Sequence, residues 1–136
     1  MSKNSIACIA FNGRKVFIAK RIPKGQMGNR WEFPGGKVEE GETEEQAIHR
    51  EFQEEFGVDV SVGEKIARAN FKHNGETFFL DAYAVTLPHD GISKKFTLTE
   101  HTEYRWAELA EIPELDFVDS DMLIYPQVCK YLAGIL

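Results

Sequence analysis

The sequence predicts an α+β fold, an α/β/α sandwich in which helices flank a mixed β-sheet. Short apolar runs next to turn dipeptides predict the strands. Two longer segments, which begin near Thr43 and near Asp119, carry helix-start signals and predict the helices. A length of 136 residues suits a single core, so we expect residues 1–136 to form one domain.

The first predicted elements are two strands joined by a tight turn. The apolar run at 6–11 is typical of a central strand. Asn12-Gly13 follows it and suits a type I′ hairpin turn, because both turn positions need positive φ. The remaining elements of this part are a second strand at 16–19, a loop at 22–30 and a short strand at 31–33.

The next predicted element is a helix with clear start and stop signals. Thr43 caps its N-terminus, and Gln46 stands three residues later, as a capping box requires. Gly57 ends the helix, because glycine readily takes the left-handed conformation found after a helix C-terminus. The apolar stripe that faces the core consists of Ile48, Phe52 and Phe56.

The second half of the chain adds a hairpin, one more strand and a final helix. Asn74-Gly75 is the turn signal between strands predicted at 64–73 and 76–87. Pro126 marks a kink or a later start within the final helix. The other predicted segments are a polar loop at 89–102, a strand at 103–107, and the helix itself from Asp119 or Ser120 toward Leu132.

Composition and charge narrow the classes of function. The hydrophobic fraction of 43% and the charged fraction of 28% are those of an ordinary globular protein. A net charge of −6 without a long basic run argues against a nucleic-acid polymer as the main partner. The sequence has no segment typical of a signal peptide or a membrane span, and Cys8 and Cys129 lie in apolar patterns typical of buried free thiols. We therefore expect a cytoplasmic protein that does not act at a membrane.

The predicted helix after Thr43 concentrates negative charge. Residues three and four apart share a helix face, so Glu51, Glu54 and Glu55 are neighbours. Three carboxylates on one face repel one another unless a cation lies between them, and oxygen ligands at this spacing suit Mg²⁺ or Mn²⁺. The alternative is an acidic face that contacts only solvent.

The loop before this helix favours the metal hypothesis. Pro34-Gly35-Gly36 lets the backbone approach a ligand closely, and a carbonyl there is a candidate metal ligand. Lys37 follows directly and is placed to contact a phosphate or to steer a carboxylate. For the glycines, the alternative is a tight turn without a ligand.

Loop and helix together form one longer motif. It matches the Nudix box, GX5EX7REUXEEXGU with U a bulky apolar residue, at every fixed position. Phe52 stands at a U position where Ile, Leu or Val is commoner. The chain therefore resembles the Nudix hydrolase family, and its run WEFPG at 31–35 is similar to the MutT-type branch. The matching residues are Gly36, Glu42, Arg50, Glu51, Phe52, Glu54, Glu55, Gly57 and Val58.

The resemblance implies a fold, a reaction and a set of ligands. The fold is a Nudix-like mixed sheet flanked by helices, along nearly the whole chain. The reaction is hydrolysis of a nucleoside diphosphate linked to another group, which for the MutT-type branch means cutting a nucleoside triphosphate to the monophosphate and pyrophosphate. Water attacks phosphorus while Mg²⁺, or alternatively Mn²⁺, binds the phosphate oxygens. The implied metal ligands are the Gly35 carbonyl, Glu51, Glu54 and Glu55, and the implied bracing ion pair is Glu42 with Arg50.

The motif leaves open which base takes the proton from water. A box glutamate or a glutamate before a late strand is the choice that the resemblance implies, and the late candidates are Glu100 and Glu103. We prefer Glu103, which stands three residues before Trp106, although both glutamates fit exposed loop acids as well. His101 is predicted to be a surface residue. The predicted catalytic set is Glu51, Glu54, Glu55, Glu103 and Lys37.

The resemblance also implies a nucleobase pocket outside the box. Arg21 is a candidate contact for the base or sugar, Phe33 is a candidate to pack on the base, and Asn29 is the third candidate. The alternatives are a surface arginine, a core phenylalanine and a loop-capping asparagine.

A polar residue near the start of the last helix is expected to hydrogen-bond the base. Counting from the helix start gives Asp121, with Asp119 as its neighbour, whereas counting back from Pro126 gives Ile124, which cannot form that bond. An aspartate suits oxidised guanine only when it is protonated, and it suits cytosine by accepting from the amino group.

The leading hypothesis is thus a Mg²⁺-dependent nucleoside triphosphate pyrophosphohydrolase, with 8-oxo-dGTP as a candidate substrate. The alternatives are a CTP- or dCTP-type pyrophosphatase, another nucleoside diphosphate-X hydrolase, and a non-catalytic nucleotide-binding module. The box keeps all of its glutamates, which favours an enzyme over a binding module. The sequence leaves a homodimer open.

Overall fold

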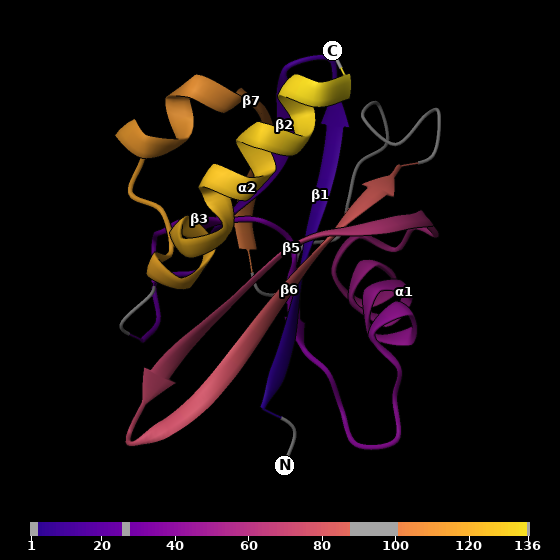
Figure 1. Ribbon diagram of the computed structural model, residues 1–136, viewed down its shortest axis with the longest axis vertical. Coiled ribbons are helices and arrows are strands. Elements are labelled where there is room, and N and C mark those ends of the chain that lie inside the picture. The colour runs from indigo at the N-terminus through magenta and orange to yellow at the C-terminus, as the bar shows by residue number, and fades with distance from the viewer. Residues whose placement is uncertain (1–2, 26–27, 88–100, 136) are drawn as a thin grey trace.

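The computed structural model describes residues 3–25, 28–87 and 101–135. Its strands and helices follow the predicted order, with a short strand at 35–37 and a 3-10 helix at 109–114 that were not predicted (Figure 1). In chain order they are β1 (Asn4–Asn12), β2 (Lys15–Arg21), β3 (Trp31–Glu32), β4 (Gly35–Lys37), α1 (Glu44–Phe56), β5 (Ser61–His73), β6 (Glu76–Thr86), β7 (His101–Glu108), the 3-10 helix η1 (Leu109–Glu114) and α2 (Asp119–Ile135).

The strands form a mixed sheet around β1. The main strand order is β3-β2-β1-β6-β5, with β4 paired to β1 and β7 paired to β2. The β1–β6 pair is parallel, whereas the other pairs between named strands are antiparallel. Figure 1 shows α1 and α2 well apart, with β1 running between them. The predicted α+β sandwich with a mixed sheet is confirmed.

Alternating residues of β1 face two separate cores. Ile6, Cys8 and Ala10 pack with the apolar stripe of α1, whereas Ala7 and Ile9 pack with residues of α2. This division follows from strand geometry, because successive side chains point to opposite faces of a sheet. The α1 side therefore includes Ile48, Phe52 and Phe56, and the α2 side includes Ile124, Val128 and Leu132.

The local signals for turns and caps are mostly confirmed. Thr43 and Gln46 form both hydrogen bonds of the capping box, and Gly57 ends α1 with φ 65°. Asn74 and Gly75 both have positive φ, as predicted for their hairpin. The first hairpin is different, because Asn12 pairs with Lys15 and the turn begins at Gly13, so Asn12 does not have the positive φ that we predicted.

The later elements differ from the prediction mainly at their ends. Strand β7 begins at His101, inside the segment predicted as a loop, and α2 begins at Asp119 and contains Pro126. Cys8 and Cys129 are free thiols, the first buried and the second half-buried. Among the described residues, none of the helices is long and apolar enough to cross a membrane.

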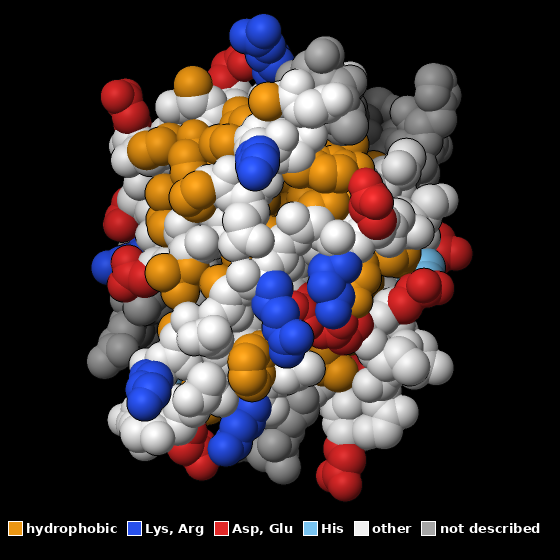
Figure 2. Space-filling model, in the orientation of Figure 1, with side chains coloured by type: hydrophobic (Ala, Val, Ile, Leu, Met, Phe, Trp, Pro, Cys, Tyr) orange, Lys and Arg blue, Asp and Glu red, His pale blue; other side chains and the backbone are white. Residues whose placement is uncertain are grey.

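An ion-pair cluster joins the first turn of α1 to the outer hairpin of the sheet. Lys65 on β5 pairs with Glu44 of α1 at 3.2 Å and with the buried Asp81 of β6 at 3.4 Å. Arg68 approaches the other oxygen of Asp81 at 3.2 Å. Figure 2 shows basic side chains beside acidic ones over this hairpin. The cluster fixes the start of the acidic helix against the sheet.

Alanine at position 35 is expected to destabilise the fold. Gly35 has φ 151°, and a Cβ there would lie 2.0 Å from the backbone oxygen of Ile6, which β1–β4 pairing holds in place. We expect Gly35→Ala to lower the free energy of unfolding by about 2 kcal/mol or more in urea titrations. Gly134→Ala is the control, because its Cβ would meet open space in α2. Equal stability of the two variants would contradict this account.

Candidate metal and nucleotide site

Helix α1 presents its three predicted metal ligands at graded depths. The side chain of Glu55 is 6% exposed, that of Glu51 is 18% exposed, and that of Glu54 is 61% exposed. Glu55 is among the buried residues of α1, together with the apolar stripe. The acidic face therefore extends from the edge of the core out to solvent.

Arg50 lies at the centre of this negative charge. Its guanidinium donates to both carboxylate oxygens of Glu42, from Nε at 2.8 Å and from Nη2 at 3.0 Å, so the predicted ion pair is confirmed. Nη1 donates to Glu51 at 3.1 Å and lies 3.5 Å from Glu54. Nη2 also donates to the backbone oxygen of Lys37 at 3.0 Å. The side chain of Arg50 therefore links the glycine loop to α1 by hydrogen bonds.

These contacts shift the pKa of both partners in the direction that keeps them charged. The hydrogen bond from Arg50 is the main cause of a lowered pKa for Glu42. The same bond is the main cause of a raised pKa for Arg50, with further contributions from Glu51. Both shifts favour the charged forms, so the bidentate contact is an ion pair at neutral pH.

The glycine loop fits closely against the helix. A Cβ at Gly36 would lie 2.5 Å from the Oε1 atom of Glu51, so only glycine leaves room for that carboxylate in its present position. Gly35, Glu51 and Glu55 line the same narrow pocket. Lys37, at the end of β4, has an exposed side chain.

The donor set fits a hard divalent cation. Carboxylates and a backbone carbonyl are the oxygen ligands that Mg²⁺ and Mn²⁺ prefer, and the pocket brings such groups from the loop and α1 together. Within the described ranges, no three acidic, His or Cys side chains converge closely enough to hold an ion as they stand. Arg50 holds Glu51 and approaches Glu54, so binding an ion would require these two carboxylates to reorient.

His101 is the residue that the sequence interpretation placed wrongly. We predicted a surface residue, but its side chain is only 4% exposed. Its Nδ1 atom lies 2.8 Å from Oε1 of Glu55, and its Nε2 atom lies 2.7 Å from Oε2 of Glu32. The ring also stacks on Phe56, with 6.2 Å between ring centroids. Burial lowers the pKa of His101, but hydrogen bonds and charge from Glu32 and then Glu55 outweigh it, so the pKa is raised.

A bulge in β7 explains this placement. Lys20 pairs with Glu103 and the next residue, Arg21, pairs with His101, so the register shifts by one residue between them. The shift puts His101 on the α1 face of the sheet. Glu103 lies on the other face, where it is 55% exposed and 3.7 Å from Lys20. Glu103 is therefore not brought together with the box glutamates, and Glu100 lies outside the described residues.

The predicted nucleobase residues are placed around Glu32 and the start of α2. Arg21 donates to both oxygens of Glu32, at 3.2 and 3.3 Å, and its side chain is 41% exposed. Asn29 is exposed with φ 65°, and its backbone amide donates to the Arg21 oxygen. The ring of Phe33 is in the core against Phe117, which was the alternative to a contact with the base.

Asp121 is the buried polar group near the start of α2. It is 6% exposed, and its Oδ2 atom accepts a 2.9 Å hydrogen bond from the backbone amide of Phe33. Burial, followed by the charge of Glu32, raises its pKa to about 8. Asp119 is exposed and pairs with Arg30, and Ile124 is in the core, so the structure separates the three candidates of this helix.

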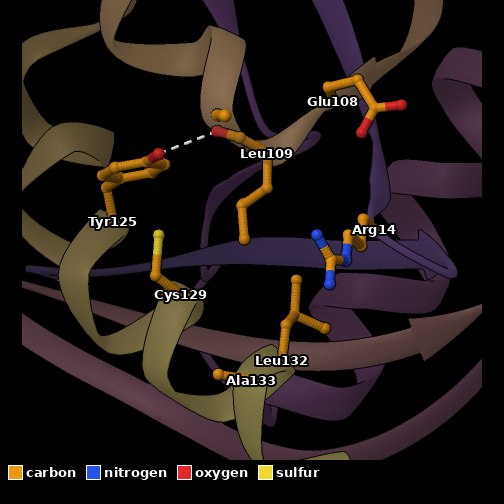
Figure 3. Close-up of a pocket in the computed structure, with 8 residues that line it drawn as sticks. Arg14, Glu108, Leu109, Tyr125, Cys129, Leu132 and Ala133 are labelled. Atoms are coloured by element: carbon orange, nitrogen blue, oxygen red, sulfur yellow. Dashed lines mark hydrogen bonds between the residues drawn. The ribbon is translucent and has the colours of Figure 1, made fainter. Parts of the chain in front are cut away.

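Another cavity, of about 480 Å³, lies at the far end of α2 (Figure 3). Apolar side chains contribute most of its lining, with Arg14 and Glu108 at one side. The Tyr125 hydroxyl donates to the Leu109 oxygen beside it at 2.7 Å, and the Cys129 sulfur is on the same side. With a single carboxylate in its lining, this cavity does not offer the donor set of the acidic helix.

An acidic helix face beside a glycine-rich loop is an arrangement that suits a divalent metal ion and a phosphate-bearing substrate. Comparisons with known proteins agree. The family model described as NUDIX domain matches residues 1–128. The chain therefore belongs to the Nudix family and is a Nudix hydrolase, and such hydrolases generally use divalent metal ions.

Individual relatives cover nearly the whole chain. A Mycobacterium tuberculosis protein named "Putative 8-oxo-dGTP diphosphatase 2" is 34% identical over 132 residues, which are 95% of this chain and 89% of that protein. The Escherichia coli CTP pyrophosphohydrolase is 30% identical, over 86% of this chain and 84% of the relative. The solution structure of a MutT protein from methicillin-resistant Staphylococcus aureus is 33% identical with a TM-score of 0.70, covering 98% and 99% of the two chains.

Alanine at position 36 is expected to damage the site but not the fold. Its Cβ would displace the carboxylate of Glu51, the end of a flexible side chain, and would meet no backbone group among its closest contacts. We expect Gly36→Ala to reduce kcat/KM by about 10-fold or more, with the urea midpoint near that of the wild type. Gly134→Ala again serves as the control. Full activity of Gly36→Ala would show that the position of Glu51 is unimportant.

The raised pKa of Asp121 predicts a pH-dependent stability. The folded protein keeps this proton up to about pH 8, whereas the unfolded chain releases it near the ordinary value of 3.8, so wild-type stability falls as pH rises between these values. Asparagine still accepts from the Phe33 amide and does not ionise. We expect Asp121→Asn to gain stability relative to the wild type by on the order of a few kcal/mol between about pH 5 and about pH 9. A pH-independent difference in urea titrations would contradict the assignment.

Proposed function

We propose that this Nudix hydrolase is a Mg²⁺-dependent nucleoside triphosphate pyrophosphohydrolase that releases a nucleoside monophosphate and pyrophosphate, and that it acts on 8-oxo-dGTP. The observation that carries the proposal is the complete acidic face of α1, which Arg50 joins to the glycine loop. The relatives support it, because their names describe 8-oxo-dGTP diphosphatase and CTP pyrophosphohydrolase activities. Mn²⁺ is the expected substitute metal.

Each residue of the site has a distinct role in this proposal. Glu51, Glu54, Glu55 and the Gly35 carbonyl would hold Mg²⁺, which neutralises phosphate charge and supports the attack of water on phosphorus. Arg50 holds the loop and helix in register. Lys37, exposed beside the loop, contacts a phosphate oxygen of the substrate.

The positions of the candidate glutamates bear on which of them takes the proton from water. A general base must be within hydrogen-bond reach of that proton, directly or through one water molecule. Glu103 is on the opposite face of the sheet from α1 and pairs with Lys20, so its position does not favour this role. The remaining candidates are a box glutamate and Glu100, which lies outside the described residues.

The protonation of Asp121 favours an oxidised purine over cytosine. With a pKa of about 8, the side chain carries a proton at neutral pH. The amide of Phe33 occupies Oδ2, so the proton on the other oxygen is available to donate to a base. Guanine and its oxidised form present carbonyl acceptors, whereas the cytosine amino group needs an acceptor. Arg21 and Asn29 are proposed to contact the same nucleotide, and Phe33 supports the base pocket from the core.

Pyrophosphate release from a panel of nucleoside triphosphates tests the substrate. The panel contains dGTP, 8-oxo-dGTP, CTP and dCTP, each assayed with Mg²⁺ and with chelator. We expect the highest kcat/KM for 8-oxo-dGTP and no release with chelator. A preference for CTP or dCTP supports the second candidate function. If no triphosphate is hydrolysed, other nucleoside diphosphate-X compounds are the next substrates, and a nucleotide-binding module is the last alternative.

Glu54→Gln is expected to remove most of the activity while keeping the fold. Glu54 is the most exposed of the three box carboxylates, so glutamine is tolerated there, but it takes one negative charge from the metal site. We expect kcat to fall about 100-fold or more with Mg²⁺. Glu45→Gln, also on α1 and 69% exposed, is the control and should keep wild-type activity. Full activity of Glu54→Gln with an unchanged metal requirement would exclude this role.

The location, the partners and the oligomeric state of the enzyme are further parts of the proposal. A net charge of −6 argues against binding to a nucleic-acid polymer or to an anionic membrane surface, and we propose a cytoplasmic enzyme whose main partner is its nucleotide. A homodimer is a further prediction, which sedimentation of the purified protein would test.

A further inference from the structure

We propose that His101 is a positioning residue, which orients the carboxylate of Glu55 for the metal site and is itself held in place by Glu32. This inference rests on the metal-dependent hydrolysis proposed above and extends it to two residues outside the Nudix box. His101 would not touch the substrate or the metal. Its role is to set the geometry of the most buried ligand.

The side chains of Glu32, His101 and Glu55 form a continuous and largely buried series of hydrogen bonds. Nδ1 of His101 is 2.8 Å from Glu55, and Nε2 is 2.7 Å from Glu32, so both ring nitrogens are in hydrogen-bond contact. The side chains of Glu32, His101 and Glu55 are 13%, 4% and 6% exposed. A buried carboxylate needs hydrogen-bond partners, and His101 supplies one to Glu55 at a fixed position.

The histidine ring is held rigidly enough to direct its neighbour. It stacks nearly parallel on Phe56, at an interplanar angle of 12°, and Phe56 belongs to the core on the α1 side. The bulge of β7 places the ring on this face, and the Glu32 contact fixes its rotation. A carboxylate has about four lone-pair sites, so one bond to His101 leaves others for a metal ion while restricting the side chain to one orientation.

The same series of hydrogen bonds extends from Glu32 to Arg21, on the side of the site where the nucleotide is proposed to bind. Glu32 accepts from Arg21 through both of its oxygens, and it also accepts the contact with His101. Arg21 is one of the residues proposed to contact the base or sugar. Glu32 therefore connects a metal ligand to a substrate contact, and both ends depend on its position.

Two substitutions of His101 separate the two ring contacts. The amide nitrogen of asparagine is near the position of Nδ1 and can still donate to Glu55, whereas the longer glutamine places its amide near Nε2 and keeps only the Glu32 contact. Binding of Mn²⁺, followed by electron paramagnetic resonance without nucleotide, measures the metal site apart from catalysis. We expect the Kd for Mn²⁺ to rise about 10-fold in His101→Gln and to stay within about threefold in His101→Asn. His49→Gln, on the solvent side of α1, is the control and should bind Mn²⁺ as the wild type does.

Glu32→Ala is a second test that leaves the histidine unchanged. It removes the acceptor for Nε2, and we expect the Kd for Mn²⁺ to rise several-fold. Arg21→Gln is its matched control for metal binding in the absence of nucleotide. It removes the other partner of Glu32 and leaves both histidine contacts, so its Kd for Mn²⁺ should stay near that of the wild type. Unfolding midpoints of all variants are measured in parallel.

The outcomes divide clearly. Weaker Mn²⁺ binding in His101→Gln with near-normal binding in His101→Asn supports the positioning role. Wild-type affinity in both folded variants overturns it, and so does an equal loss in both, because the Glu55 contact would then not be what matters. If His101→Gln does not fold, wild-type Mn²⁺ affinity in Glu32→Ala overturns the proposal. A wild-type protein that binds Mn²⁺ but hydrolyses none of the triphosphates refutes the proposed substrate alone.

Discussion

The pairing of Arg50 with the carboxylates around it is the interaction on which the site depends. Glutamates three and four apart on one helix face repel one another, and this repulsion favours unfolding of the helix unless positive charge lies among them. Arg50 supplies that charge from within the same helix and reaches Glu42, Glu51, Glu54 and the Lys37 carbonyl. Its planar guanidinium suits this task, since two parallel hydrogen bonds to Glu42 fix the angle between loop and helix. A lysine at this position would provide the charge without the geometry.

The β-sheet determines which residues lie opposite the acidic helix α1. Strand β1 divides its side chains between two cores, so α1 is fixed on one face and α2 on the other. The site is formed where α1 meets β4 and the start of β7, and Asp121 reaches the same region from α2 through the Phe33 amide. A single bulge, between the Lys20 and Arg21 pairings, decides which residue near the start of β7 lies on the α1 face of the sheet. It turns His101 inward toward Glu55 and leaves Glu103 with Lys20.

The sequence predicts the parts of this arrangement that depend on local spacing. Helical periodicity places Glu51, Glu54 and Glu55 together, the capping box fixes the start of α1, and the acidic and basic residues of the motif predict the Glu42–Arg50 pair. The role of His101 could not be read in the same way, because a bulge reverses the face that simple alternation predicts. The one signal available was the histidine beside two candidate acids. The raised pKa of Asp121 likewise depends on burial by residues distant in the chain.

The central claim is that the acidic face of α1 and the glycine loop hold the divalent metal. Paramagnetic broadening by substoichiometric Mn²⁺ in ¹H–¹⁵N NMR spectra of the wild-type protein tests it most directly, because the effect maps the ion onto backbone amides. The account predicts broadening centred on residues 35–37 and 50–55, reversed by excess Mg²⁺. Broadening centred instead on the cluster of Glu44 and Asp81, or spread evenly over the acidic surface, would contradict it.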